Sequence, residues 1–206
     1  MMMIKDYGPR VVSAWEGLRP VTKKMLERAV QTGNVTPPAV PVKKFSYDAH
    51  SDWELSRLLT ALDERIKDPE VRKDPVKLEE ITQLAETCVT VLESQTESAE
   101  IFIQLAERIL KKNDYKKLDK LSDRLMDRFP AGEVAEIVRS TDAPQIRAIA
   151  YETLALMPAN SLLPLLDDPV YAEIAINAME QKAFEYDSEE AREILERLDL
   201  EADLNG

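Results

Sequence analysis

Apolar residues recur with the period of an α-helix along most of this chain, and this periodicity constrains its fold more than any other feature. One apolar stripe is Leu55, Leu58, Leu59, Leu62 and Ile66; a second is Leu78, Ile81, Leu84, Ala85, Cys88 and Leu92; a third is Ile101, Phe102, Leu105, Ala106, Ile109 and Leu110. No segment alternates convincingly with period two, which a half-buried strand requires. The sequence therefore predicts an all-α fold in which each helix buries one face against its neighbours.

The first 45 residues differ from the rest in organisation. Residues 9–31 predict one or two short amphipathic helices, the second with Pro20 in its first turn, where a missing N–H is tolerated. Residues 32–45 contain Pro37, Pro38 and Pro41 and predict an extended, polyproline-like connector. We therefore expect a basic N-terminal helical segment with a proline-rich linker over 1–45, and a helical domain over 46–206.

Charge is unevenly distributed along the chain. The net charge is −12, yet residues 1–44 carry eight Lys/Arg and three Asp/Glu, while residues 185–206 carry nine acids and two arginines. An acidic chain repels the phosphates of nucleic acids, so nucleic acid is disfavoured as a partner. The basic N-terminal segment either folds onto the acidic body or binds a partner in trans, and the sequence leaves both alternatives open.

The composition argues against several functional classes. The five glycines are scattered, which excludes the clustered glycines of dinucleotide-binding and P-loop motifs. The single cysteine, Cys88, cannot form an intrachain disulfide, suits a reducing compartment and is predicted to be a core residue. The first residues lack the apolar region of a signal peptide, and no apolar stretch approaches the length of a membrane span. We expect a cytoplasmic protein with no catalytic residue, metal site, cofactor or membrane span.

The only histidine, His50, lies between Asp48 and Asp52, which raises the question of a metal or catalytic centre. No second histidine exists to complete such a set of ligands. Ser51 and Glu54 instead form the pattern of a capping box, in which each side chain accepts a backbone N–H of the other residue. Acidic side chains in this first turn also interact favourably with the positive end of the helix dipole. The sequence therefore predicts a helix start, with Ser51 as its N-cap.

The segment after residue 98 has the pattern of a helical hairpin. Phe102 is followed by the pair Leu105-Ala106, then by the turn Asn113-Asp114-Tyr115, and the segment ends at Pro130; Ser94 and Glu97 predict a capping box before it. In these positions, residues 99–130 resemble one tetratricopeptide repeat, although Leu118, Ser122 and Leu125 stand where that family has small or aromatic residues. The resemblance implies two paired helices that must bury their apolar face against neighbouring units.

Residues 142–154 and 167–179 form an internal repeat at a shift of 25 residues. The aligned pairs are Asp142 and Asp167, Pro144 and Pro169, Ile149 and Ile174, Ala150 and Ala175, and Leu154 and Met179. Their Asp-x-Pro pattern, with Arg147 in the first copy and Ala172 in its place in the second, is similar to that of HEAT repeats. Over 142–182 the short spacing resembles leucine-rich variant repeats. The resemblance implies that each proline opens a helix.

Together these resemblances imply an α-α superhelix, a stack of helical hairpins with a concave and a convex face. The acidic segment 188–200 is predicted to form a helix that caps the stack, with Ala191, Ile194, Leu195 and Leu198 on its apolar stripe.

Lysines surround Tyr115 at the turn of the predicted hairpin: Lys111, Lys112, Lys116, Lys117 and Lys120. Lysines interleaved with an aromatic residue are typical of a site for RNA or an acidic peptide. The favoured interpretation is a solvent-exposed turn in which the lysines pair with nearby aspartates.

Three further patterns occur in the sequence. Residues 38–43 fit a PxxP peptide followed by a basic residue, which docks in aromatic-lined grooves. Asp199, Glu201, Asp203 and Asn205 alternate like the start of an EF-hand loop, but Leu204 occupies the position that needs glycine, so no calcium site is predicted. Trp15 and Trp53 are predicted to pack on their own helices.

These patterns favour a non-catalytic helical-repeat module that binds another protein or peptide, as an adaptor, assembly factor or accessory subunit. The alternative is a nucleic-acid-associated accessory factor that uses the basic N-terminal segment and the lysines of residues 111–120. An enzyme that uses helix-borne carboxylates is the least favoured hypothesis. The sequence does not identify the partner or the oligomeric state.

Overall fold

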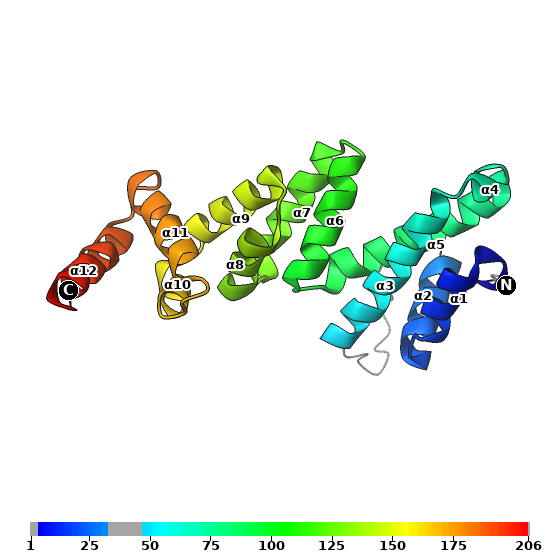
Figure 1. Cartoon of the computed structure of the whole chain (residues 1–206), viewed down its shortest axis with the longest axis horizontal. Helices are drawn as coiled ribbons and strands as arrows, with labels where there is room; N and C mark the ends of the chain where they lie inside the picture. The colour runs from blue at the N-terminus through cyan, green and yellow to red at the C-terminus, as the bar shows by residue number, and fades with distance from the viewer. Residues whose placement is uncertain (1–3, 33–46, 206) are drawn as a thin grey trace. The chain divides into compact units, whose positions relative to one another are not determined.

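The computed structural model describes residues 4–32 and 47–205, and nearly all of them are helical (Figure 1). The elements in chain order are the 3-10 helix η1 (Ile4–Tyr7) and the α-helices α1 (Pro9–Glu16), α2 (Pro20–Thr32), α3 (Ala49–Ile66), α4 (Pro69–Arg72), α5 (Pro75–Gln95), α6 (Ala99–Lys111), α7 (Tyr115–Arg128), α8 (Ala131–Ser140), α9 (Pro144–Leu156), α10 (Ala159–Leu166), α11 (Ala172–Phe184) and α12 (Glu189–Asn205). The described residues contain no strand, so the predicted all-α fold is confirmed.

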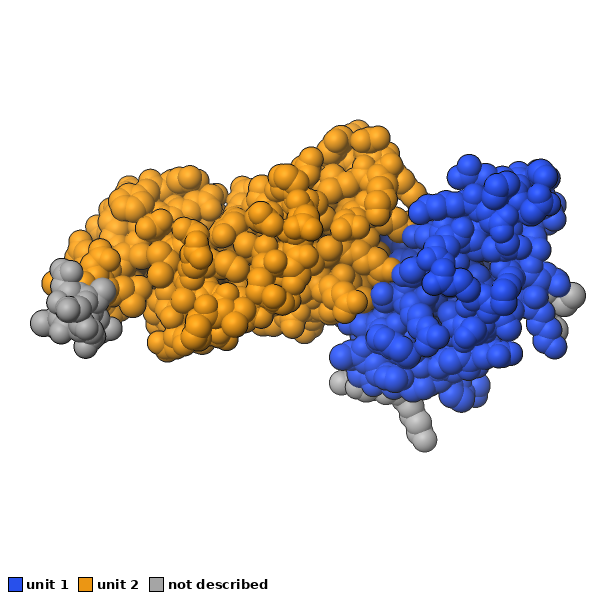
Figure 2. All heavy atoms as spheres, in the orientation of Figure 1, with its two compact units in different colours: residues 1–96 blue, residues 97–206 orange. Residues whose placement is uncertain are grey.

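The chain divides into two compact units, residues 1–96 and residues 97–206 (Figure 2). This division differs from the predicted boundary near residue 45. The reason is that α1 contacts α3 and α2 contacts α5, so the N-terminal helices belong to the first unit. The Tyr7 hydroxyl also donates a hydrogen bond of 2.9 Å to Glu80 on α5. Residues 4–32 therefore pack against α3 and α5 of the same chain. The predicted connector beyond Thr32, with its PxxP pattern, lies outside the described residues.

The first unit is built around α3 and α5, which pack against each other. They run in opposite directions. The evidence is that Thr96, directly after α5, donates a hydrogen bond of 3.0 Å to Asp52 in the first turn of α3. The two predicted stripes in this unit are buried except for Ile66 and Leu78, which are half-buried. Helix α3 ends at Ile66, and the short helix α4 lies in the connection to α5. Helix α2 begins at Pro20, also as predicted.

The second unit begins with the predicted helical hairpin, formed by α6 and α7. Asn113 in its turn has a φ of 54°, a left-handed conformation that asparagine adopts more readily than most residues. The carboxylate of Asp114 then caps α7 by accepting the backbone N–H of Lys117 at 3.1 Å. Leu118 and Leu125 are buried, so the positions that depart from the tetratricopeptide pattern contribute to the core of the hairpin.

The predicted capping box at Ser94 and Glu97 is wrong. Helix α5 continues through Gln95, and Ser94 lies within it. Helix α6 begins only at Ala99, whose backbone N–H donates a hydrogen bond of 2.8 Å to the carboxylate of Glu133 on α8. A side chain from another helix therefore satisfies the first backbone N–H of α6.

Helices of the second unit contact one another in two successions. Within one, α6 contacts α8 and α8 contacts α10; within the other, α7 contacts α9 and α9 contacts α11. The hairpin partners α6 and α7, α8 and α9, and α10 and α11 are also in contact, and α12 packs on α11. Ala191 and Ile194 of α12 are buried there, while Leu195 and Leu198 are half-buried.

The two copies of the internal repeat lie on α9 and α11, which are in contact. Helix α9 begins at Pro144, as predicted, but the prediction that Pro169 opens a helix is wrong. Asp168 closes a turn there: its carboxylate accepts the N–H of Val170 at 2.9 Å and its carbonyl accepts that of Ala172 at 2.8 Å. The two copies nonetheless contribute equivalent residues to the core. Three aligned pairs are buried in both: Ala150 and Ala175, Thr153 and Ala178, and Leu154 and Met179.

The close packing of α9 predicts how substitutions at two of its alanines change the free energy of unfolding. Ala150 is fully buried on α9, whereas Ala148 is exposed on the same helix. The substitution Ala150→Leu should lower the free energy of unfolding by about 1–3 kcal/mol, because a larger side chain forces neighbouring helices apart. Ala148→Leu is the matched control and should change it by less than about 0.5 kcal/mol. Urea unfolding followed by circular dichroism measures both; equal effects would contradict close packing at Ala150.

Candidate functional site

The acidic residues around His50 do not share one site. Asp48 pairs with Arg19, whose guanidinium nitrogens lie 2.8 and 3.0 Å from its two carboxylate oxygens. Asp52 instead accepts hydrogen bonds from the hydroxyl of Tyr47 at 2.5 Å and that of Thr96 at 3.0 Å. Asp48 lies just before the first residue of α3 and Asp52 lies in its first turn, and their partners come from different parts of the first unit. This geometry fits the predicted helix start.

Asp48, and not Ser51, is the N-cap of α3. Its carboxylate accepts both the backbone N–H and the hydroxyl of Ser51, at 2.8 and 2.7 Å, and the helix begins at Ala49. The predicted capping box is therefore wrong, although the predicted helix start is confirmed. The physical reason is that Glu54, the expected partner of Ser51, is bound elsewhere.

Glu54 is buried and holds the N-terminal helices to α3. One of its carboxylate oxygens accepts the backbone N–H of Arg19 at 2.6 Å. The other accepts the hydroxyl of Thr22 at 2.5 Å and the Nε of Arg19 at 3.2 Å. Arg19 lies between α1 and α2, and Thr22 lies on α2. One buried carboxylate thus satisfies donors from the loop and the helix that pack over it, as a buried charge requires.

The environment shifts the pKa of both carboxylates downward. Burial by itself raises the pKa of Glu54, but the hydrogen bonds from Thr22 and from the backbone and side chain of Arg19 outweigh it and lower that pKa. The hydrogen bonds from Arg19 and Ser51 hold the pKa of Asp48 well below its usual range. Both groups are therefore ionised in the folded state at neutral pH.

His50 and Trp53 lie on the exposed side of α3. The His50 ring is 5.5 Å from the Trp53 ring, and its Nε2 lies 3.6 Å from a Glu54 oxygen. The guanidinium carbon of Arg57 lies 5.4 Å from the centre of the Trp53 ring, which is 52% exposed. Trp53 thus contacts residues of its own helix, as predicted, while Trp15 on α1 is half-buried.

The predicted lysine cluster lies at the turn between α6 and α7. Lys111, Lys112, Lys116 and Lys120 are exposed, and Tyr115 is 58% exposed. Lys111 pairs with Glu107 one turn earlier on α6, at 3.3 Å. The turn therefore presents positive charge beside an exposed aromatic ring, with one of its lysines in an ion pair on its own helix.

Two other features of the sequence, the single cysteine and the EF-hand-like residues, lie within helices. Cys88 is fully buried on α5, which confirms its assignment to the core. Helix α12 runs from Glu189 to Asn205, so the residues that resemble an EF-hand start lie on a helix and not in an ion-binding loop. Among the described residues, no group of three or more His, Cys, Asp or Glu is placed to hold a metal ion.

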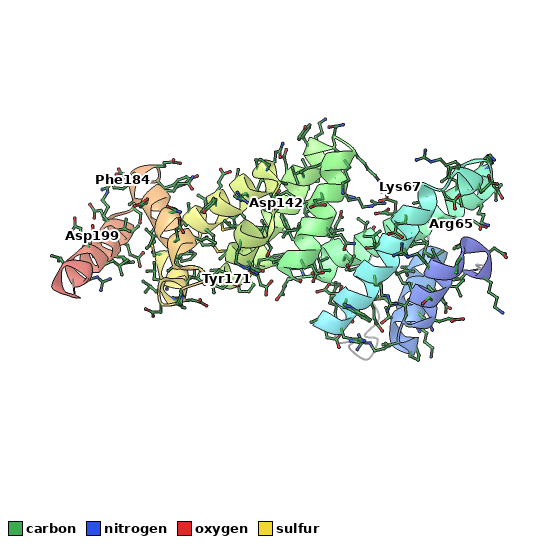
Figure 3. The ribbon with its side chains drawn as sticks, viewed as in Figure 1. Arg65, Lys67, Asp142, Tyr171, Phe184 and Asp199 are labelled. Carbon is green, nitrogen blue, oxygen red and sulfur yellow. The ribbon has the colours of Figure 1, made fainter. Side chains whose placement is uncertain are left out.

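Three exposed apolar residues lie at or just after the ends of α9 and α11, two helices that contact each other. Lys182 of α11 donates a hydrogen bond of 3.1 Å to the carbonyl of Ala155, and so brings the ends of the two helices together. Leu156 follows Ala155 directly, and Phe184 and Tyr186 follow Lys182 by two and four residues; the three are 45%, 75% and 41% exposed. We call these three residues the α9/α11 end. Figure 3 shows Phe184 at the end of α11 opposite to Tyr171.

The sequence did not single out the α9/α11 end. Phe184 and Tyr186 follow a predicted helical segment, and nothing in their local pattern distinguishes an exposed aromatic residue from a core one. Their exposure depends on where α9 and α12 pack against α11. The one available signal is the acidic composition that surrounds them.

The buried hydrogen bonds of Glu54 predict that its substitution lowers the free energy of unfolding. The substitution Glu54→Gln should lower the free energy of unfolding by about 2 kcal/mol, because it removes charge-assisted hydrogen bonds to Arg19 and Thr22. Glu64→Gln on the same helix is the control: Glu64 pairs with Arg10 at an exposed site, and its change should be under about 1 kcal/mol. Thermal and urea unfolding measure the difference, and a smaller loss for Glu54→Gln than for Glu64→Gln would contradict this role.

The lowered pKa values also predict how stability depends on pH. Because the folded pKa of Glu54 and Asp48 lies below the unfolded value of about 4, their contribution is complete above that value. It is lost as the pH falls through the folded pKa. The free energy of unfolding should therefore decrease between about pH 5 and pH 2, and Glu54→Gln should make the decrease shallower. An unchanged slope in that variant would contradict the prediction.

No single helix in the described part of the chain is long and apolar enough to cross a membrane; α9 and α10 together meet that test only as a pair bent by 113°. Comparison of the chain with protein-family models, curated proteins and solved structures gave no match. The candidate sites therefore rest on the contacts, exposure and charge of this chain's own residues.

Proposed function

We propose that this chain is a non-catalytic protein-interaction module whose α9/α11 end binds a basic, amphipathic segment of another protein. The observations that support this most directly are the exposure of Leu156, Phe184 and Tyr186 and the contact between Lys182 and Ala155, which lie near them in the chain. Large apolar side chains that lie together on a surface, with polar residues around them, are typical of an interface. Phe184, which is 75% exposed, is the natural anchor because aromatic residues dominate interface energetics.

Charge complementarity indicates the chemistry of the partner. Residues 180–193 contain six acids and two bases. Both bases are engaged within the chain: Lys182 with the carbonyl of Ala155, and Arg192 with the carbonyl of Ala183 and with Asp187. Residues 97–206 as a whole carry 24 Asp/Glu and 13 Lys/Arg. An apolar cluster in such a field attracts a segment that combines leucine-like and basic side chains, and repels an acidic one.

The packing of the second unit supports a scaffold role. Helices α6, α8 and α10 contact in succession, as do α7, α9 and α11, which is the pattern that stacked helical hairpins produce. We propose that this unit is a short helical-repeat stack, related in kind to the tetratricopeptide and HEAT-like repeats that its sequence resembles. Such stacks present helix ends and faces to partners as adaptors, assembly factors or accessory subunits.

The residues that raised the question of catalysis have structural partners instead. Asp48 caps α3, Asp52 joins α3 to the end of α5, and Glu54 joins α3 to α2. Each carboxylate thus accepts hydrogen bonds that hold parts of the first unit together. This supports a non-catalytic interpretation of the cluster around His50.

The alternative function, association with a nucleic acid, draws on the lysines around Tyr115. Their exposure favours it, but the acidic composition of the second unit opposes it, because the unit as a whole repels phosphate. The N-terminal helices α1 and α2 moreover pack on their own unit. Binding of single-stranded RNA that falls steeply with salt and is lost in Lys116→Gln would favour this alternative.

The proposed function predicts selective binding of a basic amphipathic helix. A labelled helical peptide of leucine and lysine should bind the full chain in fluorescence anisotropy, and binding should weaken with salt. The same peptide with glutamate in place of lysine should not bind. Phe184→Ala should weaken binding by about tenfold, the loss expected when an aromatic anchor is removed.

Val76→Ala is the matched control for this experiment. Val76 is 69% exposed on α5 of the other unit, so its truncation removes a similar exposed apolar group without touching the α9/α11 end. Equal affinities of the Phe184→Ala and Val76→Ala variants would contradict the proposed site. Equal binding of the lysine and glutamate peptides would contradict the proposed chemistry of the partner.

A further inference from the structure

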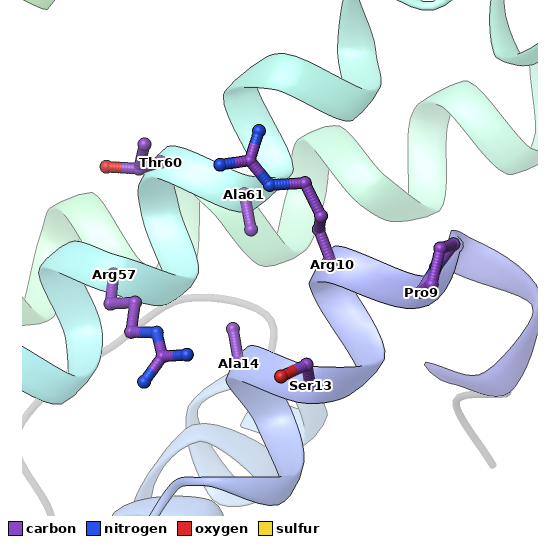
Figure 4. A pocket seen from close by; sticks show the side chains of 7 residues that line it. All are labelled: Pro9, Arg10, Ser13, Ala14, Arg57, Thr60 and Ala61. Atoms are coloured by element: carbon purple, nitrogen blue, oxygen red, sulfur yellow. The ribbon is translucent and has the colours of Figure 1, made fainter.

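A hollow of about 460 Å³ lies between α1 and α3 in the first unit (Figure 4). Arg10 and Ser13 come from α1, and Arg57 and Thr60 come from α3. Figure 4 shows that each arginine extends from its own helix toward the other helix. Ala14 and Ala61 also line the hollow and are buried. The result is an apolar floor with guanidinium and hydroxyl groups at the sides.

The lining of the hollow is suited to an anion. Its charged members are the two arginines, and the described residues that line it include no acid. A guanidinium offers several N–H donors in a planar fork that matches the oxygens of a carboxylate or a phosphate. The hydroxyl of Ser13 adds a donor from α1. Because the arginines lie on different helices, one anion between them would contact both α1 and α3.

Both arginines have exchangeable contacts at the edge of the hollow. Arg10 pairs with Glu64, and this pair is largely exposed, with side-chain exposures of 77% and 44%. Exposed pairs of this kind contribute little and are readily exchanged. Arg57 lies over the ring of Trp53, 5.4 Å from its centre. An anion that binds in the hollow would therefore compete with Glu64 for Arg10 and draw Arg57 away from Trp53.

We propose that this hollow binds a small organic oxyanion, a phosphate monoester or a carboxylate, whose apolar part lies on Ala14 and Ala61. The volume is within the range of about 300–1,000 Å³ that small-molecule sites occupy. The oxyanion lies between Arg10 and Arg57, with the hydroxyl of Ser13 as a further donor. This site belongs to the first unit and is independent of the function proposed for the α9/α11 end.

The experiment titrates the full chain with phenyl phosphate and with benzoate, which distinguish the two sources of the anion, and with uncharged benzyl alcohol as the negative probe. Binding is measured by calorimetry and by the fluorescence of Trp53, in a Trp15→Phe background that removes the other tryptophan. At least one anion should bind saturably and change the fluorescence, because Arg57 moves relative to the Trp53 ring. Benzyl alcohol should not bind.

Variants with opposite expected effects make the test specific. Arg57→Gln and Arg10→Gln should each weaken binding by about tenfold, since each removes charge-assisted hydrogen bonds. Glu64→Gln should strengthen it by about threefold, because it removes the competitor for Arg10. Lys67→Gln, the same change of charge outside the hollow, should leave it unchanged. Circular dichroism checks that each variant is folded.

The proposal is overturned if neither anion binds saturably, or if Lys67→Gln weakens binding as much as Arg57→Gln. Weaker binding in Glu64→Gln would also overturn it, because the competition for Arg10 would then be absent. Binding of a long acidic peptide alone, with neither small anion, would assign the hollow to a protein partner and overturn the proposed ligand class.

Discussion

Burial of one apolar stripe per helix is the constraint on which every other feature of this chain depends. Helices as short as α1 and α10, of eight residues each, are marginal in water by themselves. They persist because a neighbour covers the apolar face, as the full burial of Leu162 on α10 and Val11 on α1 illustrates. Because each helix relies mainly on the helices next to it, contacts in the second unit run in succession and leave helix ends uncovered.

That uncovered surface explains why the candidate sites are surfaces and hollows. At the α9/α11 end, the bond from Lys182 to the carbonyl of Ala155 joins two helix ends, and the apolar residues next to it remain exposed. In the first unit, two small residues, Ala14 and Ala61, leave space between α1 and α3 that larger side chains would fill. Acid surrounds the first site and arginine lines the second, so the two sites suit ligands of opposite charge.

Polar contacts determine how the amphipathic helices are joined. Glu54 accepts donors from Arg19 and Thr22 in a buried position, and Asp52 accepts Thr96 from the end of α5. Glu133 does the same in the second unit, where it satisfies the first N–H of α6. An unsatisfied buried group costs much more than a satisfied one contributes, so such contacts select one arrangement among those that bury the same apolar area.

The sequence by itself determined the helical class, the apolar stripes, the hairpin at residues 99–130 and the helix start near His50, because period, turn and capping signals are local. Tertiary structure decided which carboxylate caps α3 and which one is buried. Ser51 and Glu54 fit the local pattern of a capping box, but Glu54 instead accepts a hydrogen bond from Arg19, which is 35 residues away in the chain. It also decided that Phe184 is exposed and that Arg10 faces the same hollow as Arg57. These outcomes depend on distances between residues far apart in the chain, which local periodicity does not encode.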